Sequence, residues 1–142
     1  MQRVVLPVEA RDPRRVARRL APTKDNGLLV LEVCRGLDCR VCVFPERPRI
    51  VIRWMAVRDP LSGLRMRLPV VWAEVCGRTV WRARWRRGML SVESVSCAAV
   101  LEGDCVRLES GECVPRDRAI DVLRRLCGVS DAGRGHSPGA GL

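Results

Sequence analysis

Eight cysteines give this chain its widest choice of chemistry, because a thiolate can bind a metal, attack an electrophile or form a disulfide. Cys34, Cys39 and Cys42 follow one another as C-x4-C-x2-C in "CRGLDCRVC", and Cys76 comes later in the chain. Thiolates at such short spacings can meet around one metal centre. These four residues are therefore the candidate metal ligands.

The C-x4-C-x2-C spacing resembles that of the plant-type 2Fe–2S ferredoxins, which implies an iron–sulfur cluster on these thiolates. Such a cluster needs an irregular loop, whereas "LLVLEV" and "VCVF" on either side are typical of strands. An extended chain also directs Cys39 and Cys42 to opposite faces. A single C-x2-C gives weak support to zinc. We therefore predict no cofactor, with zinc or an iron–sulfur cluster as the alternative.

Disulfides are the third interpretation of the cysteines. Eight cysteines allow about 105 pairings, so sequence alone does not choose among them. Cys105 and Cys113 flank a predicted hairpin, and Cys97 could reach Cys127 on the last helix, which makes these two the plausible local pairs. Buried free thiols, packed as small hydrophobic residues, are the remaining possibility.

The residues for acid–base catalysis are few. The chain has no Tyr, one Lys and one His, and His136 falls in a Gly-rich segment where nothing would fix its position. Asp59 and Glu74 are similar in their spacing to the two acids of the PD-(D/E)xK nucleases, which implies Mg²⁺ binding. Cys76 stands where that family has its Lys. We therefore expect no catalytic residue, and a metal-dependent nuclease or metal protein is only the third alternative.

Arginines supply the strongest chemical signal. The net charge is +10, and residues 47–87 contain eleven basic and two acidic side chains, so most of the excess lies in this block. Guanidinium groups suit bidentate contacts to phosphate. The candidate nucleic-acid-binding residues lie on successive predicted strands and at the end of the last one: Arg49, Arg53, Arg65, Arg67, Arg82, Arg84, Arg86 and Arg87.

The stretch "TVWRARWRRG" contains two alternating sets of side chains. In a strand, Trp81, Ala83 and Trp85 face one side and the intervening arginines face the other. The tryptophans are therefore predicted to be buried in the core rather than to stack on bases. Whether the arginines of neighbouring strands share one open face depends on strand register.

Two helices and a series of strands are predicted to position these residues. "RDPRRVARRLAP" has Asp12 as N-cap and Pro13 as first helical residue, and "VPRDRAIDVLRRLCG" has the periodicity of a helix that ends at Gly128. Strand patterns fall at 3–9, 28–34, 39–44, 49–57, 64–75, 79–87 and in the hairpin 105–114. The segment 90–103 is ambiguous and is assigned to strand.

These elements predict an α+β fold. We expect an antiparallel, strongly twisted or partly closed sheet of about five to seven strands with a short N-terminal helix and a C-terminal helix; a mainly β barrel is the alternative. Residues 1–128 are predicted to form one domain and residues 129–142 a flexible Gly-rich tail. A hydrophobic content of 47% excludes global disorder.

The charge and composition favour a small basic protein that binds DNA or RNA through phosphates, with little sequence selectivity. The alternative is a non-catalytic interaction module, stabilised by disulfides, that binds an acidic protein. Since no signal peptide or apolar membrane span is evident, we expect a cytoplasmic protein without membrane contact. The cysteine count and scarcity of amide residues indicate a thermophilic source.

Overall fold

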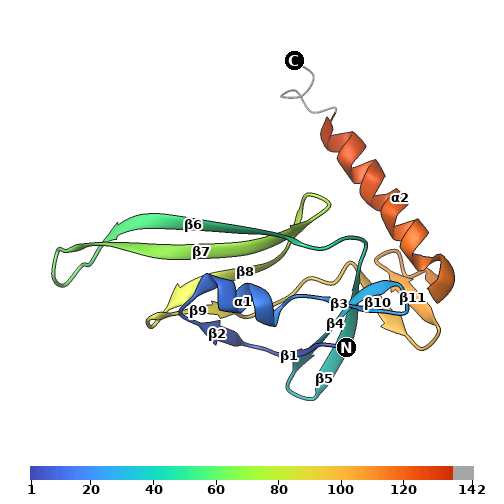
Figure 1. Ribbon diagram of the computed structural model, residues 1–142, viewed down its shortest axis with the longest axis horizontal. Helices are drawn as coiled ribbons and strands as arrows, with labels where there is room; N and C mark the ends of the chain where they lie inside the picture. Colours follow the sequence, from blue (N-terminus) through green and yellow to red (C-terminus); the bar gives the residue numbers. More distant parts are fainter. Residues whose placement is uncertain (136–142) are drawn as a thin grey trace.

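The computed structural model describes residues 1–135, which form two β-sheets and two helices (Figure 1). The five-stranded sheet has the order β2-β9-β8-β7-β6, and all its neighbouring strands are antiparallel. Its strands are β2 (Val8–Ala10), β6 (Arg49–Arg58), β7 (Arg65–Val75), β8 (Arg78–Arg86) and β9 (Met89–Val92). Most of the arginine-rich block therefore lies in this sheet.

The second sheet has seven strands in the order β1-β4-β5-β10-β11-β12, with β3 also paired to β4. β1 runs parallel to β4, and the other pairs are antiparallel. Its strands are β1 (Arg3–Val5), β3 (Thr23–Asp25), β4 (Leu28–Arg35), β5 (Asp38–Phe44), β10 (Ala99–Glu102), β11 (Cys105–Leu108) and β12 (Cys113–Pro115).

The two helices lie near the two ends of the chain. α1 (Pro13–Arg19) begins as predicted, because the Asp12 side chain accepts a hydrogen bond from the Arg14 N–H and Pro13 occupies the first turn. α2 (Arg116–Gly135) continues beyond Gly128, so the predicted helix end is wrong. A glycine weakens a helix but does not stop one. Residues 136–142 of the predicted tail, with His136, lie outside the described residues.

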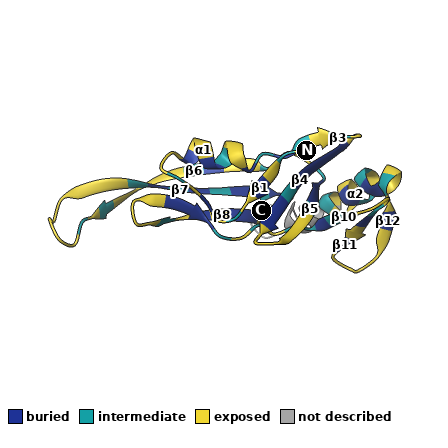
Figure 2. Ribbon diagram, turned by 90° about the horizontal axis from the view of Figure 1, so that it is seen from below, coloured by how far each residue is buried: buried dark blue, intermediate teal, exposed yellow. Residues whose placement is uncertain are grey.

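β4 and β5 separate two hydrophobic cores. Leu29, Leu31 and Val33 of β4 face the five-stranded sheet and α1, where they pack with residues such as Val71, Trp81 and Leu90. Leu28 and Val30 alternate with them and face the other core, with β11, β12 and α2. Burial on both faces explains why "LLVL", at the start of β4, is a continuous apolar run. In Figure 2 the buried strands are dark blue.

The β6–β7 hairpin extends well beyond its sheet (Figure 1). The pairing of β7 with β8 begins at Val71, so the preceding part of β7 pairs only with β6. We call residues 54–69 the arm, and residues 49–53 and 70–75 the base of the hairpin. The arm is mostly exposed and yellow in Figure 2.

Four disulfides pair all eight cysteines. The prediction for Cys105 with Cys113 is confirmed, since this disulfide closes the β11–β12 hairpin. The prediction for Cys97 with Cys127 is wrong. Cys97 pairs with Cys42 of β5, and Cys127 of α2 pairs with Cys76 at the β7–β8 turn. The tertiary fold brings these partners together across about fifty residues of sequence.

The predicted α+β class, with antiparallel strands and two helices, is confirmed in its broad form. The single sheet of five to seven strands is wrong, because the strands divide into sheets of seven and five. Neither sheet closes into a barrel. The segment 90–103 contains strand at both ends, in β9 and β10, as the strand assignment predicted.

Candidate nucleic-acid interface

The alternation predicted for "TVWRARWRRG" is present in β8. Trp81 is 3% exposed and Ala83 is buried, and Trp85 packs partly buried against the same core. Arg82, Arg84 and Arg86 are exposed on the opposite side. The turn after β8 is tight, since Arg87 and Gly88 both have positive φ, at 51° and 80°. Such a two-residue turn fits the twist of the hairpin and directs β9 back along β8.

Strand register shows which other residues share the solvent side with these arginines. Val71 lies opposite Ala83 and Trp72 lies opposite Arg82, so Val70, Trp72 and Glu74 are on the arginine side of β7. On β6, Arg53 lies opposite Val70 and Arg49 lies opposite Glu74. One solvent-facing surface of the five-stranded sheet, which we call the arginine face, therefore contains Arg49, Arg53, Arg82, Arg84 and Arg86.

Arg65 and Arg67 lie on the opposite side of β7. Arg65 lies opposite Arg58, and Arg67 lies opposite Ala56. Both arginines are on the same side of β7 as Pro69 and Val71, and at Val71 this side faces the core. Both are in the arm, beyond the reach of β8. The eight predicted arginines are thus divided among the arginine face, the arm and, for Arg87, the β8–β9 turn.

Ion pairs occupy two members of the arginine face. Arg49 Nη2 lies 2.5 Å from Glu74 Oε1, and Trp72 Nε1 donates to Glu74 Oε2 at 2.8 Å. Arg86 forms an ion pair with Glu93. Among the side chains that the structure describes, no ion pair or hydrogen bond forms at Arg53, Arg82 or Arg84. These three guanidinium groups can therefore contact an external anion without first breaking a contact to another described side chain.

Trp72 is a site residue that the sequence interpretation missed. It is half-buried on the arginine face, between Val51 of β6 and Arg82 of β8. The signal was present in "PVVWAEV", because Val71, Ala73 and Val75 form the buried set and Trp72 alternates with them. An indole beside a guanidinium offers a stacking surface next to a phosphate contact.

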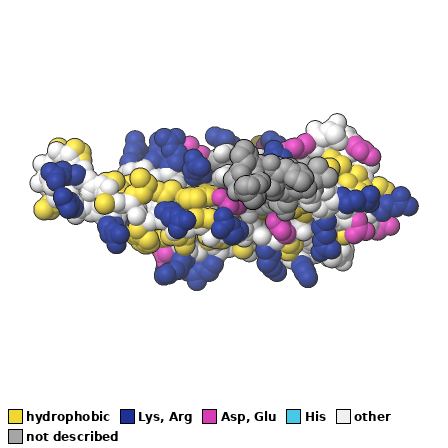
Figure 3. Space-filling view, turned by 90° about the horizontal axis from the view of Figure 1, so that it is seen from above, with side chains coloured by type: hydrophobic (Ala, Val, Ile, Leu, Met, Phe, Trp, Pro, Cys, Tyr) yellow, Lys and Arg dark blue, Asp and Glu magenta, His cyan; other side chains and the backbone are white. Residues whose placement is uncertain are grey.

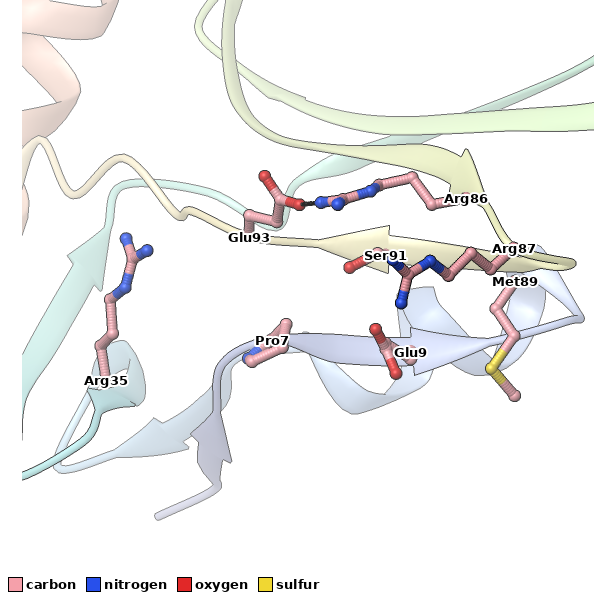
Figure 4. Close-up of a pocket in the computed structure, with 8 residues that line it drawn as sticks. All are labelled: Pro7, Glu9, Arg35, Arg86, Arg87, Met89, Ser91 and Glu93. Carbon is pink, nitrogen blue, oxygen red and sulfur yellow. Dashed lines mark hydrogen bonds and ion pairs between the residues drawn. The ribbon is translucent and has the colours of Figure 1, made fainter.

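A hollow of about 410 Å³ lies at the β2–β9 end of the arginine face (Figure 4). Arg86 points toward Glu93 from β8, and Arg35 approaches from the end of β4. Three arginines and two glutamates give the lining a small positive excess, which suits a weakly held anionic group. The lining residues are Pro7, Glu9, Arg35, Arg86, Arg87, Met89, Ser91 and Glu93.

The four candidate metal ligands do not come together. Cys34 pairs with Cys39, whereas Cys42 and Cys76 belong to two other disulfides. Among residues 1–135, two groups of one glutamate and two cysteines each have their potential ligand atoms within 4.8 Å of one another: Glu32 with Cys34 and Cys39, and Glu46 with Cys76 and Cys127. In both groups the two sulfurs are joined as a disulfide, so neither presents thiolates to a metal.

Asp59 and Glu74 also lie far apart. Asp59 is in the turn at the tip of the arm, and Glu74 is near the other end of β7. Nine residue steps separate Arg65 from Glu74, which corresponds to about 30 Å along a strand. The two carboxylates therefore cannot bind one metal ion, and the spacing that was similar to a nuclease does not produce a nuclease site.

Asp59 organises the tip of the arm instead. Its carboxylate accepts hydrogen bonds from the Ser62 hydroxyl at 2.7 Å and from the Leu61 N–H at 3.1 Å. These hydrogen bonds, the Ser62 hydroxyl first, hold the pKa of Asp59 below its usual value because they favour the ionised form. The tip is therefore a structured turn.

Comparisons with known proteins add no information on function. No protein family, curated protein or solved structure matches the chain. No helix in residues 1–135 is long and apolar enough to cross a membrane.

Proposed function

We propose that this protein binds nucleic acid through the arginine face, by contacts to phosphates and with little sequence selectivity. The observation that supports the proposal is the placement of Arg53, Arg82 and Arg84. Register brings these three arginines to one side of one sheet, and no ion pair occupies them among the described side chains. Exposed charges of one sign on a rigid surface attract a polyanion.

The spacing of the three arginines suits an extended backbone of phosphates. Arg82 and Arg84 are alternate residues of one strand, so they lie about 6.8 Å apart along it. Arg53 is two strands away, since β7 lies between β6 and β8, which adds about 9.6 Å across the sheet. Each guanidinium can therefore reach a different phosphate, and the affinity should depend strongly on salt.

Trp72 gives the surface a second type of contact. Its indole lies beside Arg82, and Glu74 fixes it by a hydrogen bond. Stacking on an aromatic ring tolerates every base, since each base has a π-face. The combination of phosphate contacts and one stacking residue supports binding that depends little on sequence.

Fluorescence anisotropy with labelled single- and double-stranded DNA and RNA, at several salt concentrations and without reductant, tests the proposal. The wild-type protein should bind with an affinity that falls steeply as salt rises. The triple variant R53A/R82A/R84A should bind more weakly, and the slope of log affinity against log salt should become shallower by about 2 to 3 units.

The matched control is R118A/R124A/R125A, which removes the same charge from exposed positions of α2. It should lower the affinity much less, because these arginines lie outside the arginine face. Equal losses in the two triple variants would show that net charge alone attracts the nucleic acid. Absence of salt-dependent binding by the wild-type protein would overturn the proposal.

A further inference from the structure

The arm has the opposite polarity from the base of the hairpin. At the base, Ile50 and Ile52 point to the core side, and Arg49 and Arg53 point to solvent. In the arm, the side that continues the arginine face is apolar, and the side that continues the core face becomes basic toward the tip. The register contains no shift between the two parts. The apolar side contains Met55, Val57, Met66 and Leu68, and the other side contains Trp54, Ala56 and Pro69 near the base and Arg58, Arg65 and Arg67 toward the tip.

The basic side of the arm concentrates charge close to the tip. Arg58 lies directly opposite Arg65, and Arg67 is the next residue on the same side of β7. Opposed side chains in antiparallel strands have Cβ atoms about 5 Å apart, and like charges at that distance destabilise the pair. The only acid in the arm, Asp59, is engaged in the turn. A bound anion would relieve this repulsion.

Two leucines project from the tip between these arginines. Leu61 is 96% exposed and Leu64 is 69% exposed. The turn that presents them is held by main-chain hydrogen bonds of 2.8 Å, from Asp59 N–H to Leu64 O and from Gly63 N–H to Asp59 O. In Figure 3 the arm forms the left end of the molecule, where basic and hydrophobic side chains adjoin.

We propose that the arm enters the minor groove of double-stranded DNA, with Leu61 and Leu64 as an apolar wedge between base pairs. This inference rests on the proposed nucleic-acid binding and adds the type of nucleic acid and the mode of contact. Proteins that enter the minor groove combine arginines, which its negative potential attracts, with apolar side chains that partly unstack a base step. Arg58, Arg65 and Arg67 would contact the phosphates that border the groove.

The apolar side of the arm favours DNA over RNA. Deoxyribose lacks the 2′-hydroxyl, so the walls of a DNA minor groove present more carbon to Met55, Val57, Met66 and Leu68. The minor groove of duplex RNA is wide and shallow and is lined by 2′-hydroxyls. A wedge between base pairs would also kink the duplex, by about 20–90° in proteins of this type.

End-to-end energy transfer in a labelled 30-base-pair DNA duplex tests the wedge, with anisotropy on the same samples to measure binding. The wild-type protein should shorten the end-to-end distance. L61A/L64A should still bind but should leave the duplex straight. The control L37A, which truncates a fully exposed leucine in the β4–β5 turn, should bend the duplex as the wild-type protein does. R58A/R65A should make the salt slope shallower by about 2 units.

The outcomes separate this inference from the proposed function. The wedge would be overturned if the wild-type protein bound duplex DNA in a salt-dependent way without bending it. It would also be overturned if L61A/L64A bent the duplex as much as the wild-type protein does. Neither result would contradict binding through the arginine face. Co-sedimentation with phosphatidylglycerol vesicles that is lost in L61A/L64A would assign the tip to a membrane surface and would also overturn the wedge. Failure of the wild-type protein to bind any nucleic acid would remove both proposals.

Discussion

The base and the arm of the β6–β7 hairpin share the same two strands and one continuous register, yet side chains are buried mainly at the base. At the base, β8 pairs with β7 and the main core covers one face of the sheet, so Val71 and Ala73 are fully buried. In the arm, neither face has a covering layer among the described residues, and Trp54 is 55% exposed. The comparison shows that strand alternation determines which residues share a face, whereas the neighbouring elements determine whether that face is buried.

The two regions also differ in how their stability arises. The base belongs to a five-stranded sheet packed on a second sheet, and apolar burial supplies most of its free energy. The arm is a two-stranded ribbon, and such a ribbon is only marginally stable without further support. Residues that do not contribute to folding are free to serve binding, and the exposed leucines and arginines of the arm fit that role.

Substitution of two tryptophans, one in the core and one in the arm, should give the largest difference in stability between the two regions. Trp81→Ala should lower the free energy of unfolding by about 3–5 kcal/mol, because it opens a cavity in the main core. Trp54→Ala in the arm should lower it by less than about 1 kcal/mol, because this side chain is already half exposed. Urea denaturation followed by circular dichroism measures both. Similar losses in the two variants would mean that the arm packs against the rest of the protein.

Removal of a disulfide should have the next largest effect on stability. The Cys76–Cys127 disulfide connects the base end of β7 to α2. Removal of the Cys76–Cys127 disulfide in C76A/C127A, whose partners are 51 residues apart, should cost about 4 kcal/mol by loop entropy. C105A/C113A, with a separation of 8, should cost about 2.5 kcal/mol. Urea denaturation without reductant measures the two losses. The reverse order would show that local strain, rather than the length of the closed loop, controls the effect.

A smaller difference is expected where apolar side chains are replaced by threonine, which keeps a high strand propensity. Ile52→Thr at the base should cost about 1–2 kcal/mol, because Ile52 packs against the main core. Met55→Thr with Met66→Thr in the arm should change stability by less than about 0.5 kcal/mol, because both side chains are exposed. A large loss in the arm variant, measured by thermal unfolding, would reveal a partner for its apolar side.

The smallest effect concerns the turn at the tip. Ser62→Ala should raise the pKa of Asp59 toward its ordinary value, because the Ser62 hydroxyl is the main group that lowers it. Since the folded pKa is lowered, the ionised carboxylate supports the turn above its ordinary pKa, and this support is lost as the pH falls through the folded value. The titration of the Asp59 carboxyl carbon by NMR measures the shift. An unchanged pKa would mean that the backbone N–H of Leu61 controls the turn.

Local chemistry explains which parts of the fold could be predicted from the sequence. Asp12 and Pro13 specify the start of α1 through adjacent backbone groups. The alternation of Trp81 and Ala83 with Arg82 and Arg84 specifies two faces of one strand, whatever lies beside it. Cys105 and Cys113 meet because a short hairpin brings its ends together.

The remaining features depend on partners that are distant in the sequence. The sequence did not indicate that Arg65 and Arg67 would face away from Arg53 and Arg84, since this depends on the register of β6, β7 and β8. A shift of one residue would have moved every side chain of a strand to the other face. The partners of Cys97 and Cys127 likewise depend on how the sheets pack.

Composition and periodicity are local properties, and they specify a surplus of arginine in one block, alternating strand patterns, two helix signals and eight cysteines. The packing and register of the strands set how these residues are divided among the surfaces of the protein. In the folded protein Arg53, Arg82 and Arg84 share one open face, whereas Arg58, Arg65 and Arg67 lie in the arm. Asp59 and Glu74 lie far apart along the hairpin. The physical reason is that periodicity is a property of one strand, whereas a surface is formed by the register of several strands.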